Sequence, residues 1–126
     1  MRSLRCLLIT MVTVCAVAGC WGHRASSQVE PDAAATLRVE NRDWLDVDVY
    51  VVQNGHRTRL GTVTATSTKS FTFPHSLVLQ RAPIQLLATP IGGPRSLVTE
   101  SIVVKPGTRV DWLLASNLST STLSVY

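Results

Sequence analysis

The sequence predicts an all-β protein, a small antiparallel β-sandwich of about seven strands. Short runs of alternating apolar and polar residues recur at spacings of roughly 10 to 15 residues, as the strands of a sandwich do. Asn54-Gly55, between two of these runs, is the strongest short signal for a β-hairpin. No segment has a convincing helical period of apolar residues. A small closed β-barrel is the alternative architecture.

The first two predicted strands follow from simple alternation. Strand 36–41 directs Leu37 and Val39 to one face and charged side chains to the other. A polar loop over 42–46 leads into strand 47–53, in which three alternating valines point inward. Each strand therefore has one face suited to a core and one suited to water.

The turn at Asn54-Gly55 predicts both a conformation and a register. A type I′ turn needs positive φ at both residues, which asparagine and glycine tolerate. Facing residues are equidistant from the turn, so the register places apolar residues on one face and an aromatic residue opposite an arginine on the other. The predicted pairs are Gln53 with His56, Val51 with Thr58, Tyr50 with Arg59, and Val49 with Leu60.

The second half of the chain supplies the remaining strands. Phe71 and Phe73 face inward from one of them, and Trp112 lies on the apolar face of another. Lys105-Pro106-Gly107-Thr108 suits a type II turn, with proline second and glycine third. The pattern looks like the immunoglobulin-like and transthyretin-like sandwiches of secreted bacterial proteins, a likeness of architecture alone. The predicted strands are 69–73, 84–89, 97–104, 109–115 and an edge strand 122–126.

A secretory signal precedes these strands. Arg2 and Arg5 form a basic start, an apolar run follows, and Val17-Ala18-Gly19-Cys20 closes it. This motif resembles the lipobox of bacterial lipoproteins, in which the cysteine is acylated and becomes the first residue of the mature chain. The apolar run of about 14 residues is shorter than the roughly 20 that a membrane-spanning helix needs. A plain signal peptide, cut without lipidation, is the alternative.

The resemblance implies an anchor and an address. Lipoproteins carry a diacylglycerol on the cysteine sulfur, and two or more acyl chains hold a protein at a bilayer far better than one. Trp21 follows Cys20, where an aspartate signals inner-membrane retention in many Gram-negative lipoproteins. We therefore expect a protein anchored to the outer membrane through Cys20, facing the periplasm or the cell surface.

Three segments follow from these signals: a signal peptide at 1–19, the lipidated cysteine and a flexible tether at 20–35, and the β-sandwich domain at 36–126. Removing 1–19 from the 126 residues leaves 107, which is one domain. Cys20 is then the last cysteine, and lipidation uses it, so we expect no disulfide. The net charge of +4 falls by two when Arg2 and Arg5 are removed with the signal. The remaining charged residues are scattered along the chain, so no nucleic-acid partner is indicated.

Residues that could support chemistry are few. Asn41, Asp43, Asp46 and Asp48 are hard-cation ligand types, but their spacing lacks the glycine and glutamate of a calcium loop. The three histidines, His23, His56 and His75, have no zinc-ligand spacing. His75 and Ser76 are adjacent, and neighbours on a strand point to opposite faces. We expect no bound metal, no cofactor and no enzymatic activity.

The candidates for partner binding are Trp44, Tyr50, Arg57 and Arg59. Trp44 lies in a polar loop. We expect its side chain to be buried over the end of the core, because a large aromatic side chain gains most from burial. Otherwise Trp44 and Leu45 form an exposed anchor for a partner. The two arginines share the outward face near Tyr50, where they suit lipid phosphate or glycan acids, although a solvated face is the commoner role.

The sequence thus predicts a membrane-anchored envelope protein that is a non-catalytic binding or structural module of unknown partner, with an envelope protein or a glycan as the candidate partners. A carrier of a small lipid or sugar is the second hypothesis, and it requires an apolar pocket of at least about 300 Å³ between the sheets or in a barrel mouth. An interior filled by Phe71, Phe73, Trp112 and the valines would contradict this carrier hypothesis.

Overall fold

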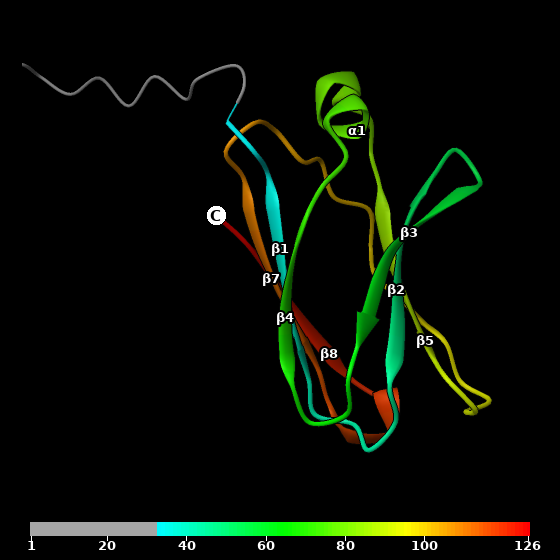
Figure 1. Cartoon of the computed structure of the whole chain (residues 1–126). Coiled ribbons are helices and arrows are strands. Elements are labelled where there is room, and N and C mark those ends of the chain that lie inside the picture. The colour runs from blue at the N-terminus through cyan, green and yellow to red at the C-terminus, as the bar shows by residue number, and fades with distance from the viewer. Residues whose placement is uncertain (1–32) are drawn as a thin grey trace, which may run out of the picture.

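Alternating side chains fold the chain into two four-stranded sheets that pack face to face (Figure 1). The computed structural model describes residues 33–126, so the predicted signal peptide, Cys20, His23 and most of the tether lie outside the described residues. No helix between residues 33 and 126 has the length and apolar character to cross a bilayer. The elements are β1 (Thr36–Asn41), β2 (Val47–Gln53), β3 (His56–Val63), β4 (Thr68–Thr72), α1 (His75–Gln80), β5 (Gln85–Pro90), β6 (Leu97–Val98), β7 (Arg109–Leu114), the 3-10 helix η1 (Ser116–Leu118) and β8 (Ser121–Val125).

The sheets have the strand orders β4-β1-β7-β8 and β3-β2-β5-β6. The predicted β-sandwich is confirmed, and both sheets are open, so the alternative of a closed barrel is wrong for the described residues. One strand pair departs from the antiparallel prediction, because β1 and β7 run parallel. This parallel pair joins the first strand of the domain to a late one, which short-range sequence patterns do not reveal.

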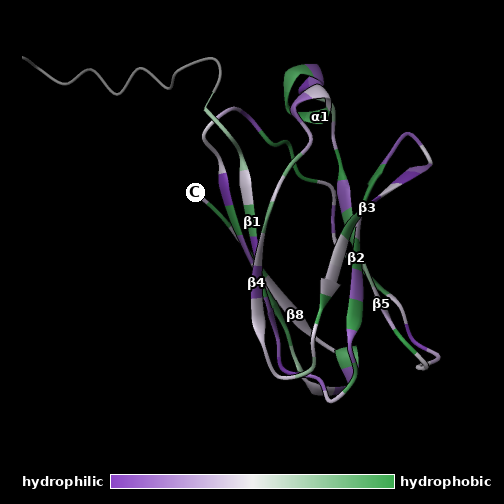
Figure 2. Cartoon of the chain, in the orientation of Figure 1, coloured by the Kyte–Doolittle hydropathy of each residue, from purple (hydrophilic) through white to green (hydrophobic). Residues whose placement is uncertain are grey.

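The space between the sheets is filled by side chains. Leu37, Val49 and Trp112 are among the fully buried residues, and Phe71 and Phe73 close the core. Figure 2 shows hydrophobic and hydrophilic residues alternating along the strands, which is why each sheet has a dry inner face and a wet outer face. The space between the sheets is therefore occupied by a packed apolar core.

The β2–β3 hairpin confirms the predicted turn and most of the register. Asn54 and Gly55 have φ of 49° and 80°, as a type I′ turn requires. One predicted pair is wrong, because Val49 faces Gly61 instead of Leu60 across a β-bulge between Val49 and Tyr50. The bulge puts glycine where the opposite sheet needs space. The confirmed pairs are Gln53 with His56, Val51 with Thr58, and Tyr50 with Arg59.

Two further expectations from the sequence are wrong. The strand predicted at 97–104 ends after Val98, because the hydroxyl oxygen of Thr99 takes the place of a backbone carbonyl in accepting the N–H of Leu86 at 2.9 Å. Pairing resumes only at an isolated bridge between Ile102 and Ile84. The expectation of a chain without helices is also wrong, since α1 follows Pro74 and η1 precedes β8. Val78 is the one buried residue of α1, and a six-residue helix of this kind leaves no periodic signal.

The remaining elements agree with the sequence to within a residue or two. The turn between β6 and β7 has the predicted form, because Gly107 has a φ of 77° and the N–H of Thr108 bonds to the carbonyl of Lys105 at 3.0 Å. Ala35, assigned to the tether, is buried, and its carbonyl accepts the N–H of Phe73 at 2.9 Å. The hydrogen bonding between these strands therefore begins at Ala35, the last residue of the predicted tether.

The two ends of the sandwich differ in what they expose. The described chain begins at one end, where the carbonyl of Ala33 accepts the N–H of Gly107 at 3.0 Å. The loops 42–46, 91–96 and 115–120 lie at the opposite end, which we call the loop end (Figure 1). β1 connects the two ends and is six residues long, about 20 Å at the usual rise of a strand.

Candidate functional site

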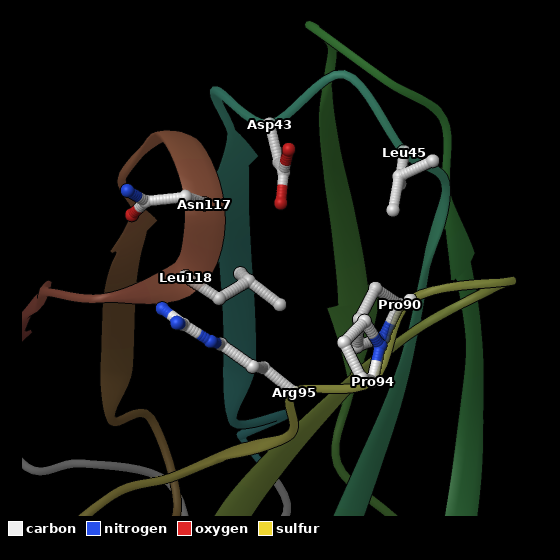
Figure 3. A pocket seen from close by; sticks show the side chains of 8 residues that line it. Asp43, Leu45, Pro90, Pro94, Arg95, Asn117 and Leu118 are labelled. Atoms are coloured by element: carbon white, nitrogen blue, oxygen red, sulfur yellow. The ribbon is translucent and has the colours of Figure 1, made fainter.

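A cavity of about 430 Å³ opens at the loop end (Figure 3). Its walls come from three loops that are distant in sequence and meet because β1, β5 and β7 all finish at this end. The lining is mostly apolar with three polar side chains. The lining residues are Asp43, Leu45, Pro90, Gly93, Pro94, Arg95, Asn117 and Leu118.

The loop 42–46 is held by one buried amide. Asn41 is 1% exposed, and its Nδ2 donates to the carbonyl of Leu45 at 2.9 Å. Its Oδ1 accepts the backbone N–H of Asp43 at 2.9 Å. The carbonyl of Asp43 in turn accepts the N–H of Thr66 at 3.0 Å. These bonds fix the loop backbone on both sides of the Asp43 side chain.

The carboxylate of Asp43 points toward the cavity in Figure 3. Asp43 is 7% exposed, and among residues 33–126 it is the one charged residue that is buried. Its Oδ1 accepts the backbone N–H of Trp44 at 2.6 Å, whereas no described group donates a hydrogen bond to its Oδ2. A carboxylate oxygen is therefore available to a ligand in a largely apolar site.

The opposite wall is built from unusual backbone. Asn117 and Leu118 have φ of 66° and 52°, and a left-handed Leu118 costs conformational energy. Asn117 stabilises this turn by accepting the N–H of Ser119 on Oδ1 at 3.0 Å. The turn directs Leu118 inward, where it is 5% exposed and covers the end of the core.

Gly93 explains how the third loop closes on the first. A Cβ built on Gly93 would lie 2.9 Å from Cγ of Pro90 and 3.0 Å from Cδ1 of Leu45. The loop can reach this contact because glycine has no side chain there. The N–H of Ile91 also bonds to the carbonyl of Asp46 at 2.8 Å, which joins the two loops directly.

The expected burial of Trp44 is wrong, because its side chain is 81% exposed. Leu118 already covers the end of the core, and the hydrogen bonds through Asn41 leave the Trp44 side chain directed to water. Leu45 and Ile91 are 39% and 52% exposed on the adjoining loops. We call Trp44, Leu45 and Ile91 the loop-end patch.

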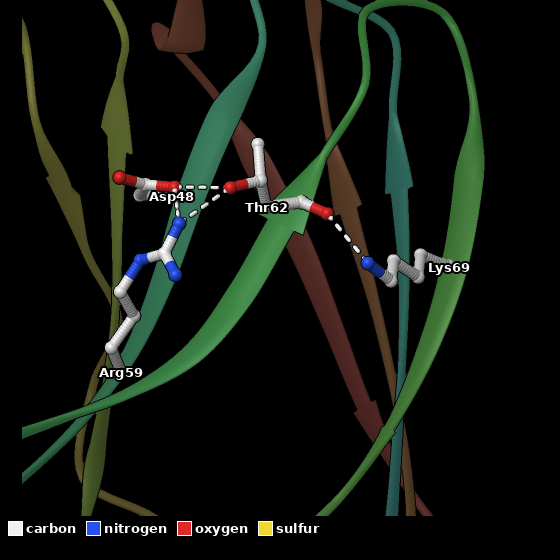
Figure 4. Close-up of polar contacts among 4 residues, drawn as sticks. All are labelled: Asp48, Arg59, Thr62 and Lys69. Carbon is white, nitrogen blue, oxygen red and sulfur yellow. Dashed lines mark hydrogen bonds and ion pairs between the residues drawn. The ribbon is translucent and has the colours of Figure 1, made fainter.

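The other candidates for partner binding lie elsewhere, on the outer face of β2 and β3. Asp48, Arg59 and Thr62 form a closed network there (Figure 4). Arg59 Nη2 donates to Asp48 Oδ1 at 2.7 Å and to the Thr62 hydroxyl at 2.6 Å, and that hydroxyl donates to Asp48 at 2.6 Å. The hydrogen bond from Arg59, with that from Thr62, lowers the pKa of Asp48.

The four predicted binding residues therefore do not form one site. Tyr50 and Arg59 face each other across the hairpin and Arg57 is two residues nearer the turn, whereas Trp44 lies at the loop end. Arg59 is occupied by Asp48, which leaves Arg57 as the arginine of this face without an ion pair among the described residues. Trp44 is the candidate that adjoins the cavity.

The acidic residues singled out in the sequence are also separated by the fold. Asp46 Oδ1 accepts the N–H of Ala65 at 2.9 Å, and Asp48 is paired with Arg59. His75 begins α1 instead of lying in an extended segment. Between residues 33 and 126, no three histidine, cysteine, aspartate or glutamate side chains gather where they could hold a metal ion.

Sequence reasoning missed Arg95, Asn117 and Leu118 as site residues. They belong to loops more than 50 residues from Asp43 along the chain. The pairing of β1 with β7 brings Asn117 and Leu118 near Asp43, and the pairing of β2 with β5 brings the loop of Arg95 there. The local signal was the polar, turn-rich composition at 91–96 and 115–120, which marks a loop but not its neighbours.

Comparison with known proteins gives only a weak structural likeness. No family model matches the chain, and no curated protein matches it. Among solved structures, an NMR structure of a protein from Eubacterium rectale aligns with 77% of this chain and 90% of its own, at 18% identity and a TM-score of 0.43.

Proposed function

We propose that this chain is a lipid-anchored protein of the bacterial cell envelope whose β-sandwich is a non-catalytic binding module. The lipobox-type motif Val17-Ala18-Gly19-Cys20 supports acylation of Cys20. The outer membrane is the proposed location, with the domain facing the periplasm or the cell surface. The partner is another envelope protein or a glycan.

The observation that carries this proposal is the position of Trp44. Its exposed side chain projects from a hydrogen-bonded loop at the end opposite to Ala33, where the described chain begins. An anchor that precedes Ala33 would attach the domain at the end opposite to the loop end and leave the loop end free to contact a partner. Tryptophan is the residue type most enriched among the residues that dominate binding energy at interfaces.

The loop-end patch adds to this support. Trp44, Leu45 and Ile91 are apolar side chains exposed on neighbouring loops, and such groupings on a soluble domain commonly mark contact surfaces. The outer face of the hairpin is a secondary surface, where Arg57 and Tyr50 suit an acidic group of lipid or glycan.

A carrier of a small lipid or sugar is the second candidate, and one observation favours it. The cavity of about 430 Å³ at the loop end falls in the size range of small-molecule sites. The packed interior opposes a ligand between the sheets, so a carried ligand would bind end-on among the loops.

The proposed binding surface is tested by cross-linking in intact envelopes. Wild type is compared with Trp44→Ala and with a matched control, Tyr126→Ala, which removes an aromatic side chain that is 69% exposed at the other end of the domain. A discrete cross-linked partner that is lost in Trp44→Ala and retained in Tyr126→Ala supports the proposal. A wild-type protein that cross-links to nothing above background contradicts it.

A further inference from the structure

We propose that the loop-end cavity binds the protonated amine of a small apolar ligand, with Asp43 as the counter-ion. The ligand chemistry is an ammonium group next to a carbonyl or carboxylate oxygen and an apolar side chain, as in a free apolar amino acid or the amino end of a short peptide. This inference rests on the proposed function and names the chemistry of a ligand for the same loop end.

The first argument is the state of Asp43. A buried carboxylate needs partners, because its loss of hydration is costly unless hydrogen bonds or an opposite charge replace the water. Asp43 is 7% exposed, receives the N–H of Trp44 on Oδ1, and keeps Oδ2 free of any described donor on the cavity side. An ammonium group supplies three donors and the opposite charge.

The second argument is preorganisation. Both backbone polar groups of Asp43 are bonded, the N–H to Asn41 and the carbonyl to the N–H of Thr66. The carboxylate is therefore held in place before any ligand arrives, which reduces the entropy lost on binding. A side chain needed only to cap this turn would not have to point into an apolar space.

The third argument is the composition of the walls. Leu45, Pro90, Pro94 and Leu118 line the same cavity as the carboxylate, so an apolar side chain of the ligand would contact apolar atoms. Low polarity also strengthens an ion pair or hydrogen bond within the site. About 430 Å³ suffices for a small molecule and is far too little for a folded domain.

The fourth argument is Arg95, the other charged residue of the lining. Its side chain lies on the far side of the cavity from Asp43 in Figure 3 and is exposed, so water screens its repulsion of an ammonium group. Arg95 instead offers donors to a carbonyl or carboxylate oxygen. A ligand with an ammonium group and a nearby oxygen satisfies both charges, whereas a simple amine satisfies one.

The test uses the full mature chain in detergent, titrated with leucine, leucyl-leucine and N-acetyl-leucyl-leucine by calorimetry. The amine-bearing probes are expected to bind at least about tenfold more tightly than the acetylated one, because acetylation removes the charge that pairs with Asp43. Tighter binding of leucyl-leucine than of leucine identifies a peptide end as the ligand, and the reverse identifies a free amino acid. Equal binding of the acetylated probe, or no binding of any probe, overturns the proposal.

Two variants locate the effect. Asp43→Asn keeps the oxygen that accepts the N–H of Trp44 and removes the charge, so the preference for the free amine should disappear. Asp46→Asn is the matched control, because this carboxylate lies in the same loop but bonds to Ala65 outside the cavity lining. Loss of the preference in both variants, or in neither, contradicts the assignment.

A second measurement covers the case in which Asp43→Asn fails to fold. In the wild-type NMR spectrum, leucyl-leucine should shift the amide signals of Gly93, Asn117 and Leu118 and leave the α1 signals unchanged. Shifts centred elsewhere overturn the site. If no peptide binds and the Trp44-dependent cross-links are still found, the ligand proposal is wrong and the proposed function stands. If peptide binds and no cross-links form, the proposed function is wrong and the ligand site stands.

Discussion

The ring of Phe71 lies directly over Gly61, so that a methyl group on Gly61 would be 2.8 Å from Cε1 of the ring. Gly61 belongs to β3 and Phe71 to β4, which are edge strands of opposite sheets. The bulge at Val49 places glycine under the ring, and Lys69 reinforces the junction by donating to the carbonyl of Thr62 at 3.1 Å (Figure 4). The two sheets are therefore joined at this edge by a contact that depends on a missing side chain.

Gly61→Ala should destabilise the domain by about 1–3 kcal/mol, because the added methyl group overpacks a filled core and the φ of 154° disfavours a side chain. Urea unfolding measures the loss. Adding Phe71→Leu to the Gly61→Ala variant should recover part of the lost stability, because the smaller side chain removes the clash. Purely additive effects of the two substitutions would show that the ring is not the cause.

The tryptophans at 44 and 112 should differ sharply in their effect on stability. Trp112 is 1% exposed, so Trp112→Ala should cost about 3–5 kcal/mol through lost burial and a cavity. Trp44→Ala should change the free energy of unfolding by no more than about 0.5 kcal/mol, since that side chain is in water. A large destabilisation by Trp44→Ala in urea unfolding would mean that the loop supports the fold and would undermine its use as a binding probe.

Arg59 should make stability depend on pH through Asp48. The pKa of Asp48 is lower in the folded chain than its ordinary value of 3.8, chiefly because of the hydrogen bond from Arg59. The stabilisation is thus fully present above that ordinary value and is lost as the pH falls through the lower folded-state pKa. Arg59→Gln should flatten this acid dependence in urea unfolding below about pH 4. Arg57→Gln, on the same face without an ion pair among the described residues, should leave it unchanged.

The outer edge of β8 gives a prediction for hydrogen exchange. Tyr126 and Arg109 exchange both backbone hydrogen bonds, at 2.8 and 3.1 Å, and such pairs alternate along an antiparallel ladder. Every second N–H of β8 therefore points to the free edge of the sheet. NMR should find fast exchange at Ser121, Leu123 and Val125 and slow exchange at Thr122, Ser124 and Tyr126. The opposite pattern would mean that the register with β7 is wrong, and uniform protection would mean that another strand covers this edge.

The sequence revealed the strands but not how they combine. Alternation identified the inward valines of β2, and Asn54-Gly55 defined the hairpin, because both are local patterns. The pairing of β1 with β7 is set by the closure of the whole sandwich, so no local pattern indicates it. The bulge at Val49 likewise depends on Phe71, which belongs to the other sheet.

The candidate site was only partly visible in the sequence for the same reason. Trp44 stood out as a large aromatic residue in a polar loop, but its exposure depends on Leu118 having taken the place over the core. Asp43 was one of several acidic residues, and only the hydrogen bonds of Asn41 distinguish it as a buried carboxylate. Contacts between distant loops decide both roles.

We propose that the sandwich works at a membrane surface, held by acylated Cys20. The most direct measurement is fractionation of cell envelopes containing wild type or Cys20→Ala, with mass spectrometry of the mature amino terminus. We predict an amino-terminal cysteine with added acyl mass in the wild-type membrane fraction, and loss of the Cys20→Ala protein from that fraction. A wild-type chain that is free of acyl groups and recovered outside the membrane would contradict the account.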